Sequence, residues 1–314
     1  MDQRPIGVFD SGLGGLTAVH SLWRILPEED LIYFGDTARV PYGSRSREAI
    51  LKYARQDVRF LRSFDLKAIL IACGTVTTTS LAALQAENDL PMVGVVEPTC
   101  RRAVLMTQNK RVGLIATAAS VRSGAYEAAL RRLDPEVTVF SRACPLFVPL
   151  AEAGRIRRGD VVIETVAREY LEPLRREGLD TLILGCTHYP LLTDIIREIM
   201  GPEVSLVNAG AESVHTLRDA LARRQLLAPE GTGQALLCTS DRPEGFGASF
   251  VGDQVFKSVD NSFSAIPGGC LHPQAVAPGF QMYTCWMIRH LDGNPWLQTT
   301  RNEDERYLWL HDAQ

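Results

Sequence analysis

Short apolar runs alternate with amphipathic helical stretches from residue 5 to about residue 240, and this alternation restricts the fold more than any other feature. It is typical of parallel α/β units, in which each strand is followed by a helix that covers the sheet. We therefore predict an α/β fold of two similar parallel-sheet domains with the active site in the cleft between them. The predicted strands are Ile6–Phe9, Leu31–Phe34, Ala68–Ala72, Met92–Val95, Arg111–Ala116, Val137–Phe140, Thr181–Leu184 and Ser205–Val207, and helical spacing is clear in Ala49–Leu61 and Val161–Leu174.

The two halves of the alternating region share an order of features. Each half has an early strand, turn and helix with hydroxyl residues, and a later strand that ends in cysteine. We predict a discontinuous first domain (residues 1–97 and 208–245) and a second domain (residues 98–207). The crossings are placed at Glu97-Pro98 and at Asn208–Gly210. The alternation fails in residues 246–314, a tail of unknown structure that we expect to add little to catalysis.

Two cysteines occupy equivalent places in this pattern. The segments Ile71–Thr75 and Leu184–His188 each put a cysteine at the end of a buried strand, with a threonine and a helix start close behind. Ligands of such sheets bind beyond the carboxyl ends of the strands, and helix N-termini lower thiol pKa values. Cys73 and Cys186 could thus face each other across one cleft and act on opposite faces of one carbon. The alternative is that both are buried structural thiols.

A glycine-rich turn, Asp10–Leu16, follows the first strand and opens a helix. It falls short of a dinucleotide fingerprint because Thr17 stands where the third glycine or alanine is needed, although Asp36 sits where a ribose-binding acid would be. Nucleotide binding stays an alternative to a small anionic ligand held by helix-start N–H groups. Asp10 could orient an ammonium group, assist a thiol or cap the helix, and His188 could assist Cys186 or be structural.

Composition excludes several classes of function. The chain has 314 residues, 46% of them hydrophobic, and a formal net charge of −4, so neither nucleic acid nor an anionic membrane is expected as the main partner. Seven cysteines without framework spacing, together with a start that lacks signal-peptide features, predict a cytoplasmic protein. Cys186 and His188 have no second ligand pair at metal-site spacing, so no metal is expected.

Six motifs together resemble the glutamate racemase family of the aspartate/glutamate racemase superfamily. They cover residues 5 to about 240 in family order and leave the tail unmatched. The motifs are Val8–Leu16, Gly35–Gly43, Ala72-Cys73, Ser123–Tyr126, Pro145–Leu150 and Leu184–Leu192.

This resemblance implies a cofactor-independent isomerase that interconverts L- and D-glutamate with two thiols and supplies D-glutamate for bacterial peptidoglycan. It implies no metal, flavin or pyridoxal phosphate, and it leaves a homodimer open. The catalytic residues that it implies are the thiols Cys73 and Cys186, with Asp10, Glu152 and His188 assisting proton transfer. The substrate-binding positions are Asp10, Ser11, Tyr42, Gly43, Gly74, Thr75, Thr117, Ser120, Thr187 and His188.

Two positions depart from the family pattern. Gly74 stands where the family usually has asparagine, so one side-chain contact to the substrate should be missing or replaced by backbone or water. Asn208 stands where the family commonly has aspartate. The first departure keeps open aspartate racemisation, or another proton transfer beside a carboxylate. A catalytically inactive binding homologue and a cysteine-nucleophile hydrolase are further alternatives, although the hydrolase would need only one of the thiols.

Overall fold

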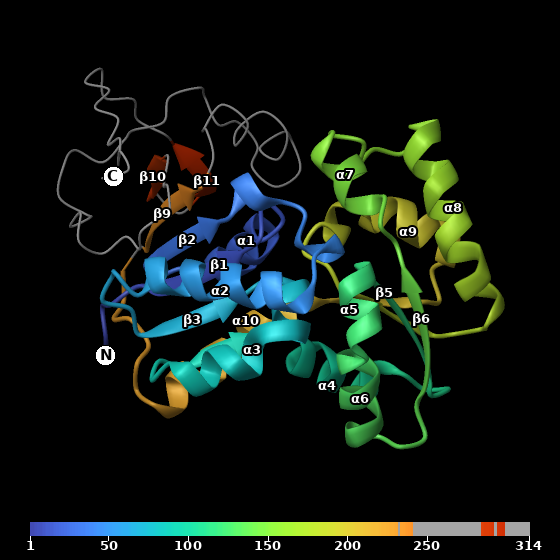
Figure 1. Ribbon diagram of the computed structural model, residues 1–314, viewed down its shortest axis with the longest axis horizontal. Helices are drawn as coiled ribbons and strands as arrows, with labels where there is room; N and C mark the ends of the chain where they lie inside the picture. Colours follow the sequence, from blue (N-terminus) through green and yellow to red (C-terminus); the bar gives the residue numbers. More distant parts are fainter. Residues whose placement is uncertain (232, 241–283, 292–293, 299–314) are drawn as a thin grey trace.

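The computed structural model describes residues 1–231, 233–240, 284–291 and 294–298, and within them the strands form two sheets that lie side by side (Figure 1). The larger sheet has the order β11-β10-β9-β2-β1-β3-β4 and the smaller one β6-β5-β7-β8. The larger sheet contains β1 (Ile6–Asp10), β2 (Leu31–Gly35), β3 (Ala68–Ile71), β4 (Met92–Gly94), β9 (Gln234–Thr239), β10 (Thr284–Leu291) and β11 (Asn294–Gln298). The smaller sheet contains β5 (Arg111–Ala116), β6 (Thr138–Ala143), β7 (Thr181–Leu184) and β8 (Ser205–Asn208).

Helices cover both faces of each sheet, and the shared cores show which helix covers which face. On the larger sheet, α1 and α10 pack on one face and α2 and α3 on the other. On the smaller sheet, α4 and α6 pack on one face and α8 and α9 on the other. The helices are α1 (Leu16–Ile25), α2 (Arg47–Leu61), α3 (Gly74–Glu87), α4 (Val96–Met106), α5 (Ala118–Ser123), α6 (Ala125–Leu133), α7 (Phe147–Glu152), α8 (Val161–Arg176), α9 (Thr193–Met200) and α10 (Ala209–Arg223), with 3-10 turns η1 (Thr37–Arg39), η2 (Tyr42–Ser44) and η3 (Tyr189–Leu192).

The two-sided burial explains why the strands read as continuous apolar runs. Along β1, Val8 packs into the core under α1 and α10, while its neighbour Phe9 packs into the core under α2 and α3. Side chains alternate between the faces of a strand, so a parallel strand covered on both sides must be apolar at every position. All eight strands predicted from the sequence are present, with ends that differ by a few residues. The predicted α/β fold with two parallel sheets is confirmed.

The chain reaches the smaller sheet through α4, which contains Glu97 and Pro98, and returns through α10. Asn208, the position that departs from the family pattern, is the N-cap of α10. Its side chain accepts hydrogen bonds from the N–H groups of Gly210 (3.0 Å) and Ala211 (3.3 Å). The domain boundaries drawn from the sequence stay a prediction.

The end of the larger sheet contains strands that the sequence analysis did not predict. β9 pairs parallel with β2, and β10 and β11 then extend the sheet in antiparallel order. Part of the tail therefore belongs to the same sheet as β1. The proline- and glycine-rich stretch Ile266–Cys270 lies outside the described residues.

The carboxyl ends of the parallel strands in the two sheets face each other. Thr17, at the start of α1, donates from its hydroxyl to the carbonyl of Thr187 beyond β7 (2.9 Å). The hydroxyls of Thr75 and Thr117, from the two sides, are 3.0 Å apart. Both sheets thus direct their strand-end residues into one shared space, where ligands of such sheets bind.

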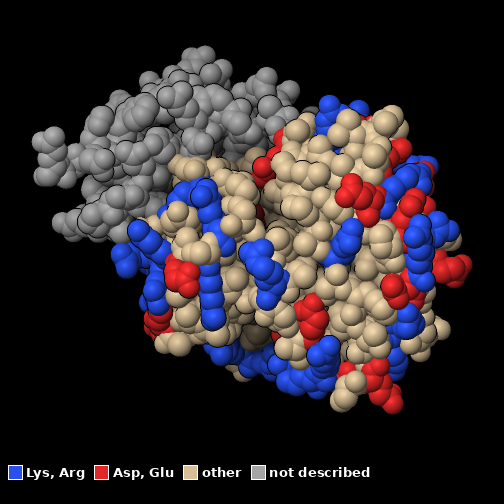
Figure 2. Space-filling model, turned by 45° about the vertical axis from the view of Figure 1, so that its right-hand side comes forward, with Lys and Arg blue, Asp and Glu red and all other residues tan. Residues whose placement is uncertain are grey.

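Acidic and basic side chains are interspersed on the face seen in Figure 2, as expected from the small net charge. Among the described helices, none is both long and apolar enough to cross a bilayer.

Candidate active site

The predicted site residues meet at a cavity of about 230 Å³ where the two sheets face each other. Asp10 and Ser120 lie behind its wall, fully buried, and contact the lining residues Thr187 (3.4 Å) and Thr117 (3.1 Å). The structure therefore brings all the predicted positions together, while their roles stay a prediction. The predicted residues that line the cavity are Ser11, Tyr42, Gly43, Cys73, Gly74, Thr75, Thr117, Glu152, Cys186, Thr187 and His188.

Cys73 follows β3 by two residues and occupies the N-cap position of α3, close to the strand end where the sequence predicts it. Its Sγ lies 3.3 Å from the Oγ of Ser11, to which it donates. Burial raises the pKa of the Cys73 thiol to about 12; the nearby Asp10 carboxylate adds to this rise, and the Ser11 hydrogen bond opposes it. At neutral pH Cys73 is therefore a thiol, suited to give a proton.

Cys186 follows β7 and faces a different set of groups. Its Sγ is 3.8 Å from His188 Nδ1, and His188 Nε2 is 3.1 Å from the carboxylate of Glu152 on α7. Burial lowers the pKa of His188, but the hydrogen bonds with Cys186 and Glu152 outweigh it and raise the pKa to about 10. Cys186 therefore stands beside an imidazole that carries a positive charge at neutral pH, whereas the hydrogen-bond partner of Cys73 is the hydroxyl of Ser11.

Asp10 ends β1 and sits at the base of the glycine-rich turn. Its carboxylate accepts from the N–H of Gly12 (3.0 Å) and from the hydroxyl of Thr187 (3.4 Å). It is not the cap of α1, whose N-cap residue is Gly15. Burial raises the pKa of Asp10, and the charge of His188 opposes the rise. Asp10 thus connects the turn of the larger sheet to the Cys186 side of the cavity.

Hydroxyl groups and helix starts supply the donors of the site. Thr117 caps α5, and its hydroxyl contacts those of Thr75 (3.0 Å) and Ser120 (3.1 Å). α3 begins at Gly74, directly beside the cavity. Among the described lining residues there is no lysine or arginine. A carboxylate bound here must be held by N–H and O–H donors and by the imidazolium of His188.

Tyr42 lines the cavity, but its hydroxyl is bonded elsewhere. Its hydroxyl contacts the buried carboxylates of Asp36 and Asp57 (2.9 Å to Asp57), so it is directed away from the cavity that the residue lines. Gly43 packs against Thr117, whose Cβ lies 2.9 Å from where a Cβ of residue 43 would be. This loop therefore offers the cavity its backbone rather than a phenol.

Gly74 explains one departure from the family pattern. A Cβ at this position would lie 2.6 Å from the carbonyl oxygen of Gly185, closer than any real contact. The missing side chain lets the start of α3 approach the turn after β7, so backbone of the smaller sheet fills that space.

Some lining residues were given no role by the sequence analysis. Cys144 is a third buried thiol at the cavity, and burial raises its pKa. Cys144 directly follows β6, which ends at Ala143. The sequence analysis ended this strand at Phe140, so Cys144 was not recognised as a strand-end residue. The other unassigned lining residues are Gly12, Val40, Pro41, Ser44, Ala118, Pro145, Val148 and Pro149.

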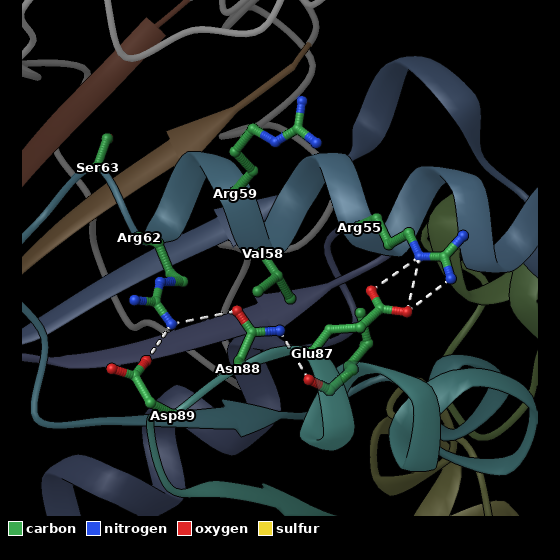
Figure 3. Close-up of a pocket in the computed structure, with 9 residues that line it drawn as sticks. Arg55, Val58, Arg59, Arg62, Ser63, Glu87, Asn88 and Asp89 are labelled. Atoms are coloured by element: carbon green, nitrogen blue, oxygen red, sulfur yellow. Dashed lines mark hydrogen bonds and ion pairs between the residues drawn. The ribbon is translucent and has the colours of Figure 1, made fainter.

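A larger hollow, of about 660 Å³, opens on the surface between α2 and the end of α3 and lacks this chemistry. Figure 3 shows two of its arginines turned toward acids: Arg55 pairs with Glu87 (2.6 Å) and Arg62 with Asp89. These are solvent-exposed ion pairs, screened by water and salt. No thiol or histidine lines this hollow within the described residues, so the smaller cavity is the candidate active site.

The pKa of Cys73 gives a prediction about its reactivity. We expect alkylation of Cys73 by iodoacetamide to be slow at pH 7 and to rise about tenfold per pH unit up to pH 10, because only the thiolate reacts. Peptide mass spectrometry of the Cys186→Ser variant would measure the rate at Cys73 alone. A rate that levels off below pH 9 would show that the thiol is far more acidic than its surroundings indicate.

Comparisons with known proteins show the family to which the chain belongs. Residues 17–215 match the family model of the Asp/Glu/hydantoin racemases. Glutamate racemase of Geobacter metallireducens is 46% identical over 259 residues, which cover 81% of this chain and 95% of that protein. Glutamate racemase of Thermoanaerobacter pseudethanolicus is 43% identical over 78% of this chain and 91% of its own length.

Solved structures give the same result. A glutamate racemase isoform from Bacillus anthracis superposes with a TM-score of 0.77 at 35% identity, covering 81% of this chain and 96% of that one. Glutamate racemase from Francisella tularensis, solved in complex with D-glutamate, superposes with a TM-score of 0.74 at 37% identity, covering 80% and 93%. The chain belongs to the Asp/Glu/hydantoin racemase family, on its glutamate racemase branch, and is an isomerase.

Proposed function

We propose that this protein interconverts L- and D-glutamate by a two-thiol mechanism without a cofactor. The observation that carries the proposal is the placement of Cys73 and Cys186 at strand ends of opposite sheets, lining one cavity. Two acid–base groups on opposite sides of one carbon are what inversion at that carbon requires. The relatives named glutamate racemase support glutamate as the substrate.

The proton transfer follows from the unequal surroundings of the thiols. In one direction, Cys186 as thiolate takes the α-proton and Cys73 delivers its own proton to the opposite face. In the other direction the roles are reversed. His188, held by Glu152 at 3.1 Å, stabilises the Cys186 thiolate, and Ser11 accepts from Cys73 at 3.3 Å. Asp10 lies close to both Cys73 and His188. We assign it to the substrate ammonium group or to proton transfer at Cys73.

Fixed donors must stabilise the intermediate, because an α-proton of an amino acid is only weakly acidic. Negative charge moves into the α-carboxylate as the proton leaves, and preorganised N–H and O–H groups stabilise that charge best where water is excluded. The start of α3 and the residues Thr75, Thr117 and Thr187 line the cavity, which supports this role for their N–H and O–H groups. We assign the substrate's carboxylates to these donors and to the backbone of Tyr42 and Gly43.

D-Glutamate made in this way would supply peptidoglycan synthesis, the role that the family resemblance implies. Catalysis on aspartate is the related alternative, and the same assay separates the two.

The function is tested by incubating the purified, EDTA-treated protein with L-glutamate or D-glutamate and separating the enantiomers by chiral chromatography. We expect both reactions to reach equal amounts of the two enantiomers without added metal or cofactor. Aspartate is the parallel substrate, and the Cys73→Ser/Cys186→Ser double variant is the control. Racemisation of aspartate but not of glutamate would show that aspartate is the substrate. Racemisation of neither amino acid would overturn the proposal.

A further inference from the structure

One wall of the cavity is a loop whose position is set from behind by buried charges. The five consecutive residues 40–44 all line the cavity. Beneath them, the carboxylates of Asp36, at the end of β2, and Asp57, on α2, are fully buried. A charged side chain on the buried face of a helix destabilises the folded state unless it is paired, so its partners show which segments it fixes.

Arg39 is the cation that these two carboxylates share. Its Nε lies 2.6 Å from Asp36 and its Nη2 lies 2.7 Å from Asp57. The same guanidinium contacts Gln56 and lies over the ring of Tyr53, 4.5 Å from its centre. The residue directly before the loop is thus fixed both to Asp36, which follows β2, and to Asp57 on α2.

Tyr42 is the second point at which the loop is fixed. Its hydroxyl contacts Asp36 and Asp57, the same pair that Arg39 bridges. Burial and the neighbouring Asp36 raise the pKa of Asp57, whereas Arg39 and the Tyr42 hydroxyl oppose that rise by stabilising the charged carboxylate. We call Asp36, Arg39, Tyr42 and Asp57 the buried latch.

The latch also reaches the end of β9 and the residue that follows it. The hydroxyl of Ser240 donates to Asp36 (2.6 Å) and accepts from the N–H of Ala38 (3.1 Å). The hydroxyls of Thr37 and Thr239 are in contact beside it. The loop is therefore fixed to β2, α2 and β9, none of which carries a proposed catalytic thiol.

We propose that Asp57 and Arg39 are positioning residues for substrate binding, which act by holding loop 40–44 in the place where its backbone meets the substrate. This inference rests on the proposed function, because its readout is the handling of glutamate. Both thiols stand on other elements, so loss of the latch should weaken binding and leave the proton-transfer step largely intact. A role in folding alone would instead lower stability without a selective effect on binding.

The test compares Asp57→Asn with Glu29→Gln. Glu29 forms a second buried ion pair, with Lys67, at the amino ends of β2 and β3, and it does not line the cavity. Both variants remove one carboxylate charge from a buried pair, so both should be less stable. Only Asp57→Asn should raise KM for glutamate, about tenfold, with kcat within about twofold of the wild-type value. Calorimetric titration with D-glutamate should give a Kd that rises in parallel.

Tyr42→Phe keeps both carboxylates and Arg39, and it decides the question if Asp57→Asn does not fold. We expect its KM to rise about threefold, since one of the two points that fix the loop is lost. An unchanged KM in a folded Asp57→Asn or Tyr42→Phe, or an equal rise in Glu29→Gln, would overturn the latch while leaving the proposed function intact. A wild-type protein that does not racemise glutamate would overturn the proposed function itself, and the latch as a binding device with it.

Discussion

Cys73→Ser and Cys186→Ser are each expected to lose racemisation of glutamate by a factor of about 10³ or more, with the fold retained. Each thiol supplies one of two proton transfers, and general acid–base catalysis by a positioned group contributes about 10²–10⁴-fold. A serine hydroxyl is too weak an acid to replace a thiol at neutral pH. The rate of racemisation would be measured by following the circular dichroism signal of the glutamate enantiomers over time.

Cys100→Ser is the matched control for these variants. Cys100 is as deeply buried, on α4, but it does not line the cavity. Its replacement should leave racemisation close to the wild-type rate. Racemisation above about a tenth of the wild-type rate in either Cys73→Ser or Cys186→Ser would be too high for a thiol that carries a whole proton transfer.

Gly14→Ala should reduce kcat by about 100-fold although residue 14 has no reactive group, because small displacements of acid–base groups are that costly. A Cβ at this position would overlap the hydroxyl of Thr187 and the ring of His188, lying 2.6 Å from His188 Cε1. The alanine must therefore push the His188 ring away from Cys186 and Glu152, or push the two sheets apart. Steady-state kinetics with both enantiomers would show the loss in kcat.

Gly231→Ala separates this effect from a general cost of replacing glycine. A Cβ at Gly231 would meet no atom of the described residues within 4 Å, so kcat and KM should stay as in the wild type. A Gly14→Ala protein with wild-type kcat would show that the close approach of the turn to His188 is unimportant for the reaction.

The positions of the thiols could be predicted because strand ends are a local property. The apolar run Ala68–Ala72 and the run Thr181–Leu184 end at small residues, and parallel sheets carry their ligands at that edge. Which strand ends face each other depends on contacts between distant segments. The approach of Gly14 to His188 and of Gly74 to Gly185 has no local sequence signal, so it could not be predicted.

The latch and the end of the larger sheet were missed for different physical reasons. Asp57 lies on the buried face of the amphipathic helix α2, and a carboxylate there indicates a buried partner. Its partners Arg39 and Tyr42 come from η1 and η2, which the helix pattern does not reveal. The hydroxyl of Tyr42 could not be oriented from its motif, because a turn residue can present either its side chain or its backbone. β10 pairs with β9 across more than 40 residues of chain that show no α/β alternation, so its place in the sheet depends on tertiary contacts.

The central claim, that two thiols serve opposite faces of one carbon, is tested most directly by α-proton exchange in D₂O. Each single variant keeps one thiol, which can remove and return a proton on its own face only. Nuclear magnetic resonance of L-glutamate and D-glutamate incubated with Cys73→Ser and with Cys186→Ser should show deuterium entering opposite enantiomers in the two variants. Deuterium entering the same enantiomer in both variants would contradict the two-thiol account.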